Sequence, residues 1–318
     1  MKYILGKIVT ALVTMFLVSV FCFFAFGVIR GDPANFLAGI NATPEYLENL
    51  RREIGLDRNI VIRYIDWLVN FLSGNPGDSI RFRGENISSM INERLPVSFT
   101  LALTSLLLIL IISLPVSLLT VKREGSLPDR ITNFLTAGAI SAPGFFIGLL
   151  FIWIFGLVFH LFTPGLFIDY KENLFEFLKC LFFPALAIAV PNSAILIKFL
   201  RGSIFQELKK DYVRTAKSKG AGRLYILRRH VLKNSLIPAV TIFGMIIAEI
   251  FSGSIIIEQV FTIPGIGRLL VAAVSSRDYP LIQTLMVYIA FIVVLANTLA
   301  DIAIMLLDPR IRTFKEVK

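Results

Sequence analysis

The sequence predicts an all-α membrane protein with six transmembrane helices, and three observations support this fold class. Of the 318 residues, 56% are hydrophobic and only 17% are charged, whereas a soluble domain is usually about 25% charged. Several charge-free stretches reach the roughly 20 residues that a spanning helix needs. Lys and Arg are distributed unequally between alternate connecting segments. This composition excludes a disordered chain and disfavours a soluble enzyme.

The apolar stretches predict the six spans in order. They cover residues 8–29, 97–121, 131–160, 180–197, 235–257 and 279–307. The first is longer than the apolar core of a signal peptide, and no Ala-x-Ala site follows it, so we expect it to remain as a span. The third is expected to bend at Pro143, which membrane helices tolerate. Within it, Gly144 and Gly148 have the spacing that permits close helix contact.

The distribution of basic residues predicts that both termini are cytoplasmic. With that orientation the inside segments hold 20 Lys or Arg residues, and the short outside loops hold 4. Residues 30–96 form a long outside segment with 8 Arg and 9 acidic residues. Long segments cross the membrane largely regardless of charge, so this one does not weaken the assignment.

The long segment after the first span, residues 31–96, carries signals of extracytoplasmic helices. Thr43 can cap a helix whose first residue is Pro44, and Gly55 can end it. Asp57 can cap a second helix, in which apolar residues recur at helical spacing until the turn residues at 73–77. Two interpretations stay open, namely an amphipathic cap on the membrane surface and a docking or gating surface on the outer face.

In the cytoplasmic segment 201–234, the sequence pattern predicts two helices separated by a turn at Gly220-Ala221-Gly222. Residues 204, 208, 212 and 216 recur at helical spacing before the turn, and 224, 227 and 231 after it. A basic loop that binds anionic lipid headgroups is the simpler alternative. Gly220 can turn the chain sharply because glycine accepts a positive φ at little cost.

The sequence contains no recognisable nucleotide-binding, metal-binding or catalytic motif. It lacks a Gly-x-x-x-x-Gly-Lys-Ser/Thr phosphate loop. Cys22 and Cys180 lie in apolar stretches, and His160 and His230 are far apart, which predicts neither a disulfide framework nor a metal centre. We therefore expect no cofactor in this chain, no catalytic residues and no nucleic-acid partner.

Three polar residues in the predicted spans are candidates for a translocation pathway. They are Glu249, Asn297 and Asp301. Charged residues inside a membrane are costly and usually face a cavity or a partner. Glu249 could meet the amino terminus of a peptide or a cation, or it could be a protonated side chain hydrogen-bonded between helices. Asp301 could instead pair with a basic residue of the 201–234 loop.

Several motifs resemble one known family. Residues 211–220 (DYVRTAKSKG) and 229–234 (RHVLKN) are similar to the cytoplasmic "EAA" loop of binding-protein-dependent ABC import permeases, in the version of the dipeptide, oligopeptide and nickel permeases, B-type subunit. Further matches occur in the same order, at residues 31–34 (GDPA), 93–96 (ERLP), 141–143 (SAP), 260–268 (VFTIPGIGR), 277–280 (RDYP) and 307–310 (LDPR). The generic loop begins Glu-Ala-Ala, whereas this chain has Arg214-Thr215-Ala216.

This resemblance implies the type I ABC importer permease fold in a prokaryotic plasma membrane. It implies a first span at 1–30, an extracytoplasmic segment at 31–96, a five-helix core at 97–308 with the cytoplasmic 201–234 loop, and a tail at 309–318. The implied partners are a homologous C-type permease, two ATPase subunits or domains that bind ATP and Mg²⁺, and an extracytoplasmic binding protein. The residues implied to couple this chain to the ATPase are Asp211, Tyr212, Arg214, Thr215, Ala216, Lys217, Gly220, Arg229 and His230.

The resemblance also implies a substrate class. Dipeptides and oligopeptides are the leading expectation, and nickel, metal-chelating small molecules and oligosaccharides are the alternatives within the family. An ion-coupled secondary transporter that uses Glu249 and Asp301 is a more remote alternative, disfavoured because no inverted repeat is visible in the spans. A receptor or scaffold that acts through residues 30–96 is the remaining alternative.

Overall fold

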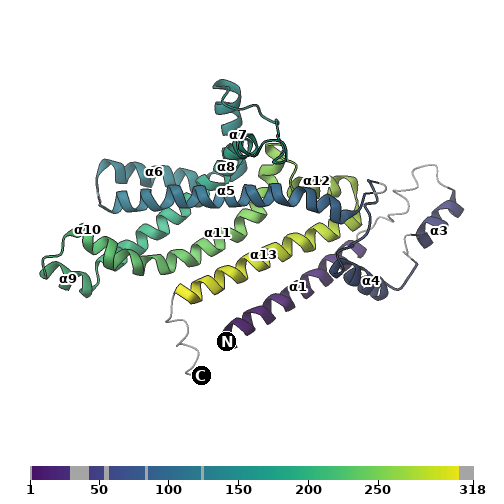
Figure 1. Ribbon diagram of the computed structural model, residues 1–318, viewed down its shortest axis with the longest axis horizontal. Coiled ribbons are helices and arrows are strands. Elements are labelled where there is room, and N and C mark those ends of the chain that lie inside the picture. The colour runs from purple at the N-terminus through teal and green to yellow at the C-terminus, as the bar shows by residue number, and fades with distance from the viewer. Residues whose placement is uncertain (1, 29–42, 54–56, 83–84, 123–124, 308–318) are drawn as a thin grey trace. The chain divides into compact units, whose positions relative to one another are not determined.

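In the part of the chain that its computed structural model describes, the regular secondary-structure elements are helices, joined by turns and irregular segments. That part comprises residues 2–28, 43–53, 57–82, 85–122 and 125–307. Contacts divide the chain into two compact units: unit 1 is Met1–Phe99 with Pro264–Val294, and unit 2 is Thr100–Ile263 with Leu295–Lys318. Helices α5 (Ile87–Lys122) and α13 (Tyr279–Leu307) contribute to both units (Figure 1).

The predicted spans are present, but the third is broken. Among the described residues, five helices are long and apolar enough to cross a membrane, and the bent pair Leu127–Ser141 and Gly144–Val158 brings the number to six if it is counted as one span. The first helix of this pair is α6 (Leu127–Ser141). The second is α7 (Gly144–Phe151), which continues as the π-helix η1 (Ile152–Val158), and the bend between the two is 105°. Pro143 forces Ala142 into an extended conformation, with φ −94° and ψ 127°, and cannot donate a helical hydrogen bond. The expected bend at Pro143 is therefore a break between two helices.

In unit 1, the first span α1 (Lys2–Val28) packs against the amphipathic helix α4 (Ile60–Leu72). The hydroxyl groups of Ser19 and Tyr64 share a hydrogen bond of 2.9 Å. The Phe23 ring lies 5.3 Å from Tyr64 and 5.7 Å from Trp67, measured between ring centroids. The recurring aliphatic residues of α4 lie on its exposed side, so its aromatic residues make the contact with α1.

The two helices predicted within residues 31–96 exist, with one different cap. Helix α3 (Pro44–Glu53) begins as predicted, and the Thr43 hydroxyl accepts a hydrogen bond of 3.3 Å from the Tyr46 N–H. The predicted end at Gly55 lies outside the described residues. Asn59, and not Asp57, caps α4 by accepting from the Val61 N–H at 2.9 Å, because Asn59 directly precedes the first helical residue.

Unit 1 also holds a buried carboxylate that joins segments far apart in the sequence. Asp278 is 1% exposed and precedes α13, after the unpredicted short helix α12 (Ile266–Ser276). Its carboxylate accepts from the Ser79 hydroxyl at 2.5 Å, from the Arg81 N–H at 3.1 Å and from the Leu281 N–H at 3.3 Å. Asp278 thus fixes the chain that follows α4 to the turn between α12 and α13.

In unit 2, the long helix α8 (Leu174–Leu208) packs against α6, α7 and α11 (Leu232–Val260). Glycines permit the closest approaches. A Cβ at Gly148 would lie 3.0 Å from the Phe261 ring and 3.7 Å from the Ala187 Cβ, which confirms the close contact predicted for this position. A Cβ at Gly244 of α11 would lie only 2.7 Å from the Cβ of Ala300 in α13.

Candidate functional site

The 201–234 loop begins inside a helix and changes direction before its most basic part. The structure corrects the single helix predicted up to residue 216, because α8 ends at Leu208 and α9 (Asp211–Ser218) begins after Lys210. Lys210 takes an extended conformation with ψ 154°, which separates the two helices. Val213 of α9 is 0% exposed and provides the apolar anchor of this short helix within unit 2.

A cluster of four polar side chains, which we call the Glu207 cluster, holds the junction between α8 and α9. The Glu207 carboxylate accepts from the Tyr212 hydroxyl at 2.7 Å and from the Lys210 ammonium group. Asn234, in the first turn of α11, donates to the Tyr212 hydroxyl at 3.4 Å. Burial and the Glu207 carboxylate raise the pKa of Tyr212, so the phenol stays protonated and keeps donating. The cluster thereby fixes α9 to both α8 and α11.

Helix α9 ends at the predicted glycine turn. Gly220 has a φ of +80°, its N–H bonds to the Lys217 carbonyl at 2.9 Å, and the Ala221 N–H bonds to the Ala216 carbonyl at 3.1 Å. This pair of bonds is the Schellman arrangement, which requires a left-handed residue that glycine adopts most readily. The prediction that Gly220 turns the chain is therefore confirmed.

After the turn, the chain returns to the membrane through α10 (Arg223–Ile226) and the π-helix η2 (Leu227–Val231), which continue into α11. Ile226, Leu227 and Val231 are buried. Arg229 and His230 are exposed, and the His230 ring lies 5.8 Å from the ring of Tyr225. This segment therefore also has an apolar inner side and a basic outer side.

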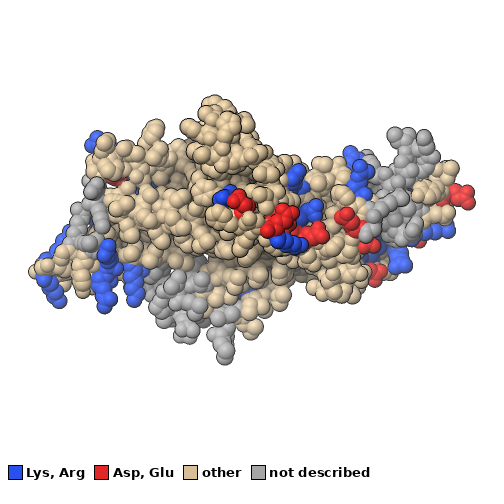
Figure 2. Space-filling view, turned by 45° about the horizontal axis from the view of Figure 1, so that its top comes forward, with Lys and Arg blue, Asp and Glu red and all other residues tan. Residues whose placement is uncertain are grey.

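The exposed side of the loop forms a concentrated basic surface. Figure 2 shows Lys and Arg side chains gathered at the end of unit 2 that carries α9 and α10 in Figure 1. Its exposed basic residues are Lys209, Lys210, Arg214, Lys217, Lys219, Arg228, Arg229 and Lys233. Asp211 and Thr215 are also exposed, and Asp211 lies 3.6 Å from Arg214, in a pair too exposed to contribute much stability. Such a surface can bind an acidic protein groove or anionic headgroups.

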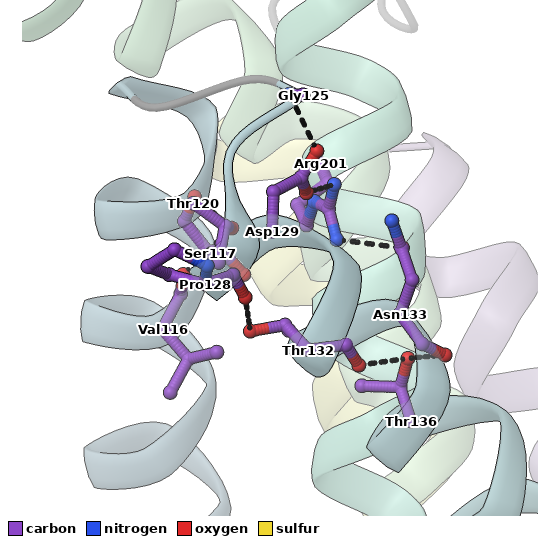
Figure 3. Close-up of polar contacts among 10 residues, drawn as sticks. All are labelled: Val116, Ser117, Thr120, Gly125, Pro128, Asp129, Thr132, Asn133, Thr136 and Arg201. Atoms are coloured by element: carbon purple, nitrogen blue, oxygen red, sulfur yellow. Dashed lines mark hydrogen bonds and ion pairs between the residues drawn. The ribbon is translucent and has the colours of Figure 1, made fainter.

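A second polar network lies behind this surface, between α6 and α8 (Figure 3). Arg201 of α8 and Asp129 of α6 form an ion pair, and their side chains are only 8% and 9% exposed. Arg201 also donates to the Asn133 side-chain oxygen at 2.8 Å, and Asp129 accepts from the Gly125 N–H at 3.0 Å. Since Arg201 and Glu207 lie on the same helix, about 9 Å apart along its axis, the network links the start of α6 to the region that fixes α9.

The three candidate residues in the spans lie on α11 and α13. Glu249 lies on an exposed side of α11, so it is not enclosed between helices of this chain. Asn297 of α13 is exposed and Asp301 is half-buried. The structure thus brings the loop residues together at one end of unit 2 and leaves Glu249 in the middle of a span.

Sequence reasoning missed the residues that hold the loop in place. Glu207, Asn234, Arg201 and Asp129 were not predicted as site residues. The spacing of Glu207 and Tyr212 does not by itself indicate contact, because the helix break between them was not predicted. The pairing of Arg201 with Asp129 joins residues 72 positions apart. Charged residues close to the ends of the predicted spans 131–160 and 180–197 are the signal that could have indicated the Asp129–Arg201 network.

Comparisons with known proteins identify the family of this chain and support its fold. Residues 113–313 match the family described as the binding-protein-dependent transport system inner membrane component, and residues 1–104 match the N-terminal region of such membrane components. One solved structure of the MetNI methionine ABC transporter, inward-facing, is similar with a TM-score of 0.55 and 16% identity. That similarity covers 69% of this chain and 96% of the other. It supports the fold.

Curated relatives match over nearly their full length. A probable peptide ABC transporter permease of Sinorhizobium fredii is 34% identical over 98% of this chain and 99% of its own. An oligopeptide transport system permease of Bacillus subtilis is 32% identical over 97% of this chain and 98% of its own. A putative peptide transport system permease of Brucella abortus is 31% identical with the same coverage. The chain is thus a multi-pass membrane protein that belongs to the family of binding-protein-dependent transport system inner membrane components, the permeases of ABC importers.

Proposed function

We propose that this protein is one of two permease subunits of an ATP-driven importer of dipeptides or oligopeptides. It forms half of the translocation pathway and couples to a separate ATPase through the 201–234 loop. The second half is a homologous C-type permease, and an extracytoplasmic binding protein delivers the substrate. ATP and Mg²⁺ bind to the ATPase, and this chain performs no chemistry of its own.

The single observation that carries the coupling role is the construction of α9. It is a short helix with a buried anchor at Val213, a polar cluster that fixes its start and a Schellman turn that fixes its end. Its exposed residues are mainly basic and polar. A simple headgroup-binding loop does not need such fixation, whereas an element that transmits movement from an ATPase must be rigid.

The mechanism is a shift between two conformations. Closure of the ATPases on ATP moves the attached α9 helices, and the spans pass from an inward-open to an outward-open state. A ligand shifts such an equilibrium only by its different affinity for the two states. Arg201, Asp129 and Asn133 carry the movement from the end of α8 to the start of α6.

Peptides are the substrate class that the relatives' names favour. The test is purification of the affinity-tagged chain from its native membrane, followed by assay of the complex in proteoliposomes. We expect a second permease and an ATPase to co-purify, and loaded binding protein to stimulate ATP hydrolysis. Stimulation by a peptide-loaded binding protein supports the proposal. Stimulation only by nickel, a metal chelate or an oligosaccharide contradicts the peptide assignment, and absence of any ATPase contradicts the coupling role.

A further inference from the structure

Helix α11 has two sides of different character. Its buried side carries Ile246, Ile250 and Ile257, each 2% exposed, together with small residues such as Ala239. This side packs against α8 and α7. The opposite side is formed by residues that recur at mostly three- or four-residue spacing along the helix, and we call it the α11 open face. It consists of Pro238, Thr241, Met245, Glu249, Ser252, Gly253, Ile256 and Gln259, all exposed.

The α11 open face is too polar for a lipid contact. Glu249 lies midway along the apolar span Pro238–Val260, and Thr241, Ser252 and Gln259 lie on the same side. A charged side chain facing the centre of a bilayer costs at least about 2.5 kcal/mol. Among the described residues, no hydrogen bond or ion pair reaches the Glu249 carboxylate.

Helix α5 of the same unit has an exposed side of different composition. Its exposed large residues Leu103, Leu107, Ile111 and Leu119 recur every four or eight positions and are 46–66% exposed. No charged residue interrupts this row. The contrast indicates that the α11 open face is turned towards water or a polar solute, and the α5 side towards hydrocarbon.

The charge of the α11 open face selects the kind of solute. Glu249 is its one charged residue, and no Lys or Arg occurs between Pro238 and Val260. A carboxylate attracts a cation, and this attraction strengthens when a bound solute displaces the surrounding water. The free amino terminus of a peptide is such a cation. Thr241, Ser252 and Gln259 can pair with the peptide's amide groups as it moves along the helix.

We propose that the α11 open face lines the translocation pathway and that Glu249 is a specificity-determining residue, which receives the protonated amino terminus of the transported peptide. This inference rests on the proposed function, and it adds the position of the pathway on this subunit and the group on the substrate that the permease recognises.

The position of the pathway is tested by thiol labelling in the assembled importer. Cys22 and Cys180 are first replaced by Ala, and single cysteines are then introduced as Thr241→Cys, Ser252→Cys and Gln259→Cys. A membrane-impermeant methanethiosulfonate should modify these positions, and saturating peptide-loaded binding protein with ATP should change the rate. Leu107→Cys and Ile111→Cys on α5 are matched controls and should not react. Unreactive α11 positions in an importer that still transports peptide overturn the inference but leave the proposed function intact.

The role of Glu249 is tested by uptake of a dipeptide and of the same dipeptide acetylated at its amino terminus. Each is supplied at a concentration that saturates the binding protein. The original protein should prefer the free amino terminus by about tenfold or more, since acetylation leaves the carboxylate unpaired. Glu249→Asp should keep the preference, and Glu249→Gln should lose it. An unchanged preference in Glu249→Gln, or no preference in the original protein, overturns the role, whereas absence of ATP-dependent peptide uptake in the original protein contradicts the proposed function itself.

Discussion

Individual side chains determine how the 201–234 loop is held. Gly220 ends α9 with a φ of +80°, and Tyr212 starts it by bonding to Glu207. Neither residue contributes much apolar burial. Their importance is geometric, because each one limits the directions in which a short helix of eight residues can leave the loop. Changes at these positions should therefore alter coupling more than stability.

We predict that Gly220→Pro abolishes uptake while the complex still assembles in the membrane. Proline fixes φ near −65° and removes the N–H that bonds to the Lys217 carbonyl, so the Schellman turn cannot form. Such a change costs about 3 kcal/mol locally, enough to lower uptake by more than about tenfold. Gly220→Asn, which tolerates the left-handed conformation, should retain most uptake. Undiminished ligand-stimulated ATP hydrolysis by Gly220→Pro in proteoliposomes would speak against the coupling role.

We predict that Tyr212→Phe lowers the amount of peptide imported per ATP hydrolysed. The substitution removes the donor to a carboxylate, a bond that contributes about 1.5–3 kcal/mol, and it leaves the ring in place. With the Glu207 cluster weakened, α9 should transmit less of the ATPase movement to the spans. Tyr225→Phe is the control, because Tyr225 is 58% exposed and lies outside the cluster. The ratio of uptake to hydrolysis measures the effect, and an equal ratio in both variants would exclude a positioning role for Tyr212.

Whole helices depend on close approaches that particular residues permit. Helix α11 meets α13 at Gly244, where Ala300 leaves no room for another Cβ. Helix α6 meets α8 through the buried pair of Asp129 and Arg201. The α11–α13 contact is possible because Gly244 has no side chain. The α6–α8 contact is made by two buried charges, and removing either one would leave the other unpaired at a high cost in free energy. The first contact joins two helices that follow the 201–234 loop in the chain, and the second joins two helices that precede α9.

We predict that Gly244→Ala lowers the thermal stability of the protein in detergent. The new Cβ would lie 2.7 Å from the Ala300 Cβ, so the two helices must separate, at a cost of about 1–3 kcal/mol. Gly253→Ala is the matched control on the same helix, because a Cβ there meets nothing within 4 Å and alanine has the higher helix propensity. A melting temperature of Gly244→Ala equal to that of Gly253→Ala would show that the α11–α13 contact does not limit stability.

Features with local causes could be predicted from the sequence, and features with distant partners could not. The Thr43 cap, the interruption at Pro143 and the turn at Gly220 each depend on a few adjacent residues. The bond from Ser79 to Asp278 spans 199 positions, and only the folded chain brings them together. The break between α8 and α9 was missed because Lys209 and Lys210 are compatible with a helix.

At the scale of the whole molecule, we propose a permease that depends on a partner for energy. Under this proposal the spans form a pathway and the basic surface of the 201–234 loop attaches to the ATPase, and the sequence contains no phosphate-binding loop. The competing account, an ion-coupled transporter, would instead draw energy from protonation of Glu249 and Asp301. The two accounts differ in what the isolated chain can do and in what the complex requires.

The most direct test is uptake of a labelled peptide into proteoliposomes, measured for the chain alone and for its complex with the second permease, the ATPase and the binding protein. We expect accumulation only by the complete complex with ATP and Mg²⁺, and none by the chain alone under a proton or sodium gradient. Accumulation by the chain alone, driven by an ion gradient without nucleotide, would contradict this expectation.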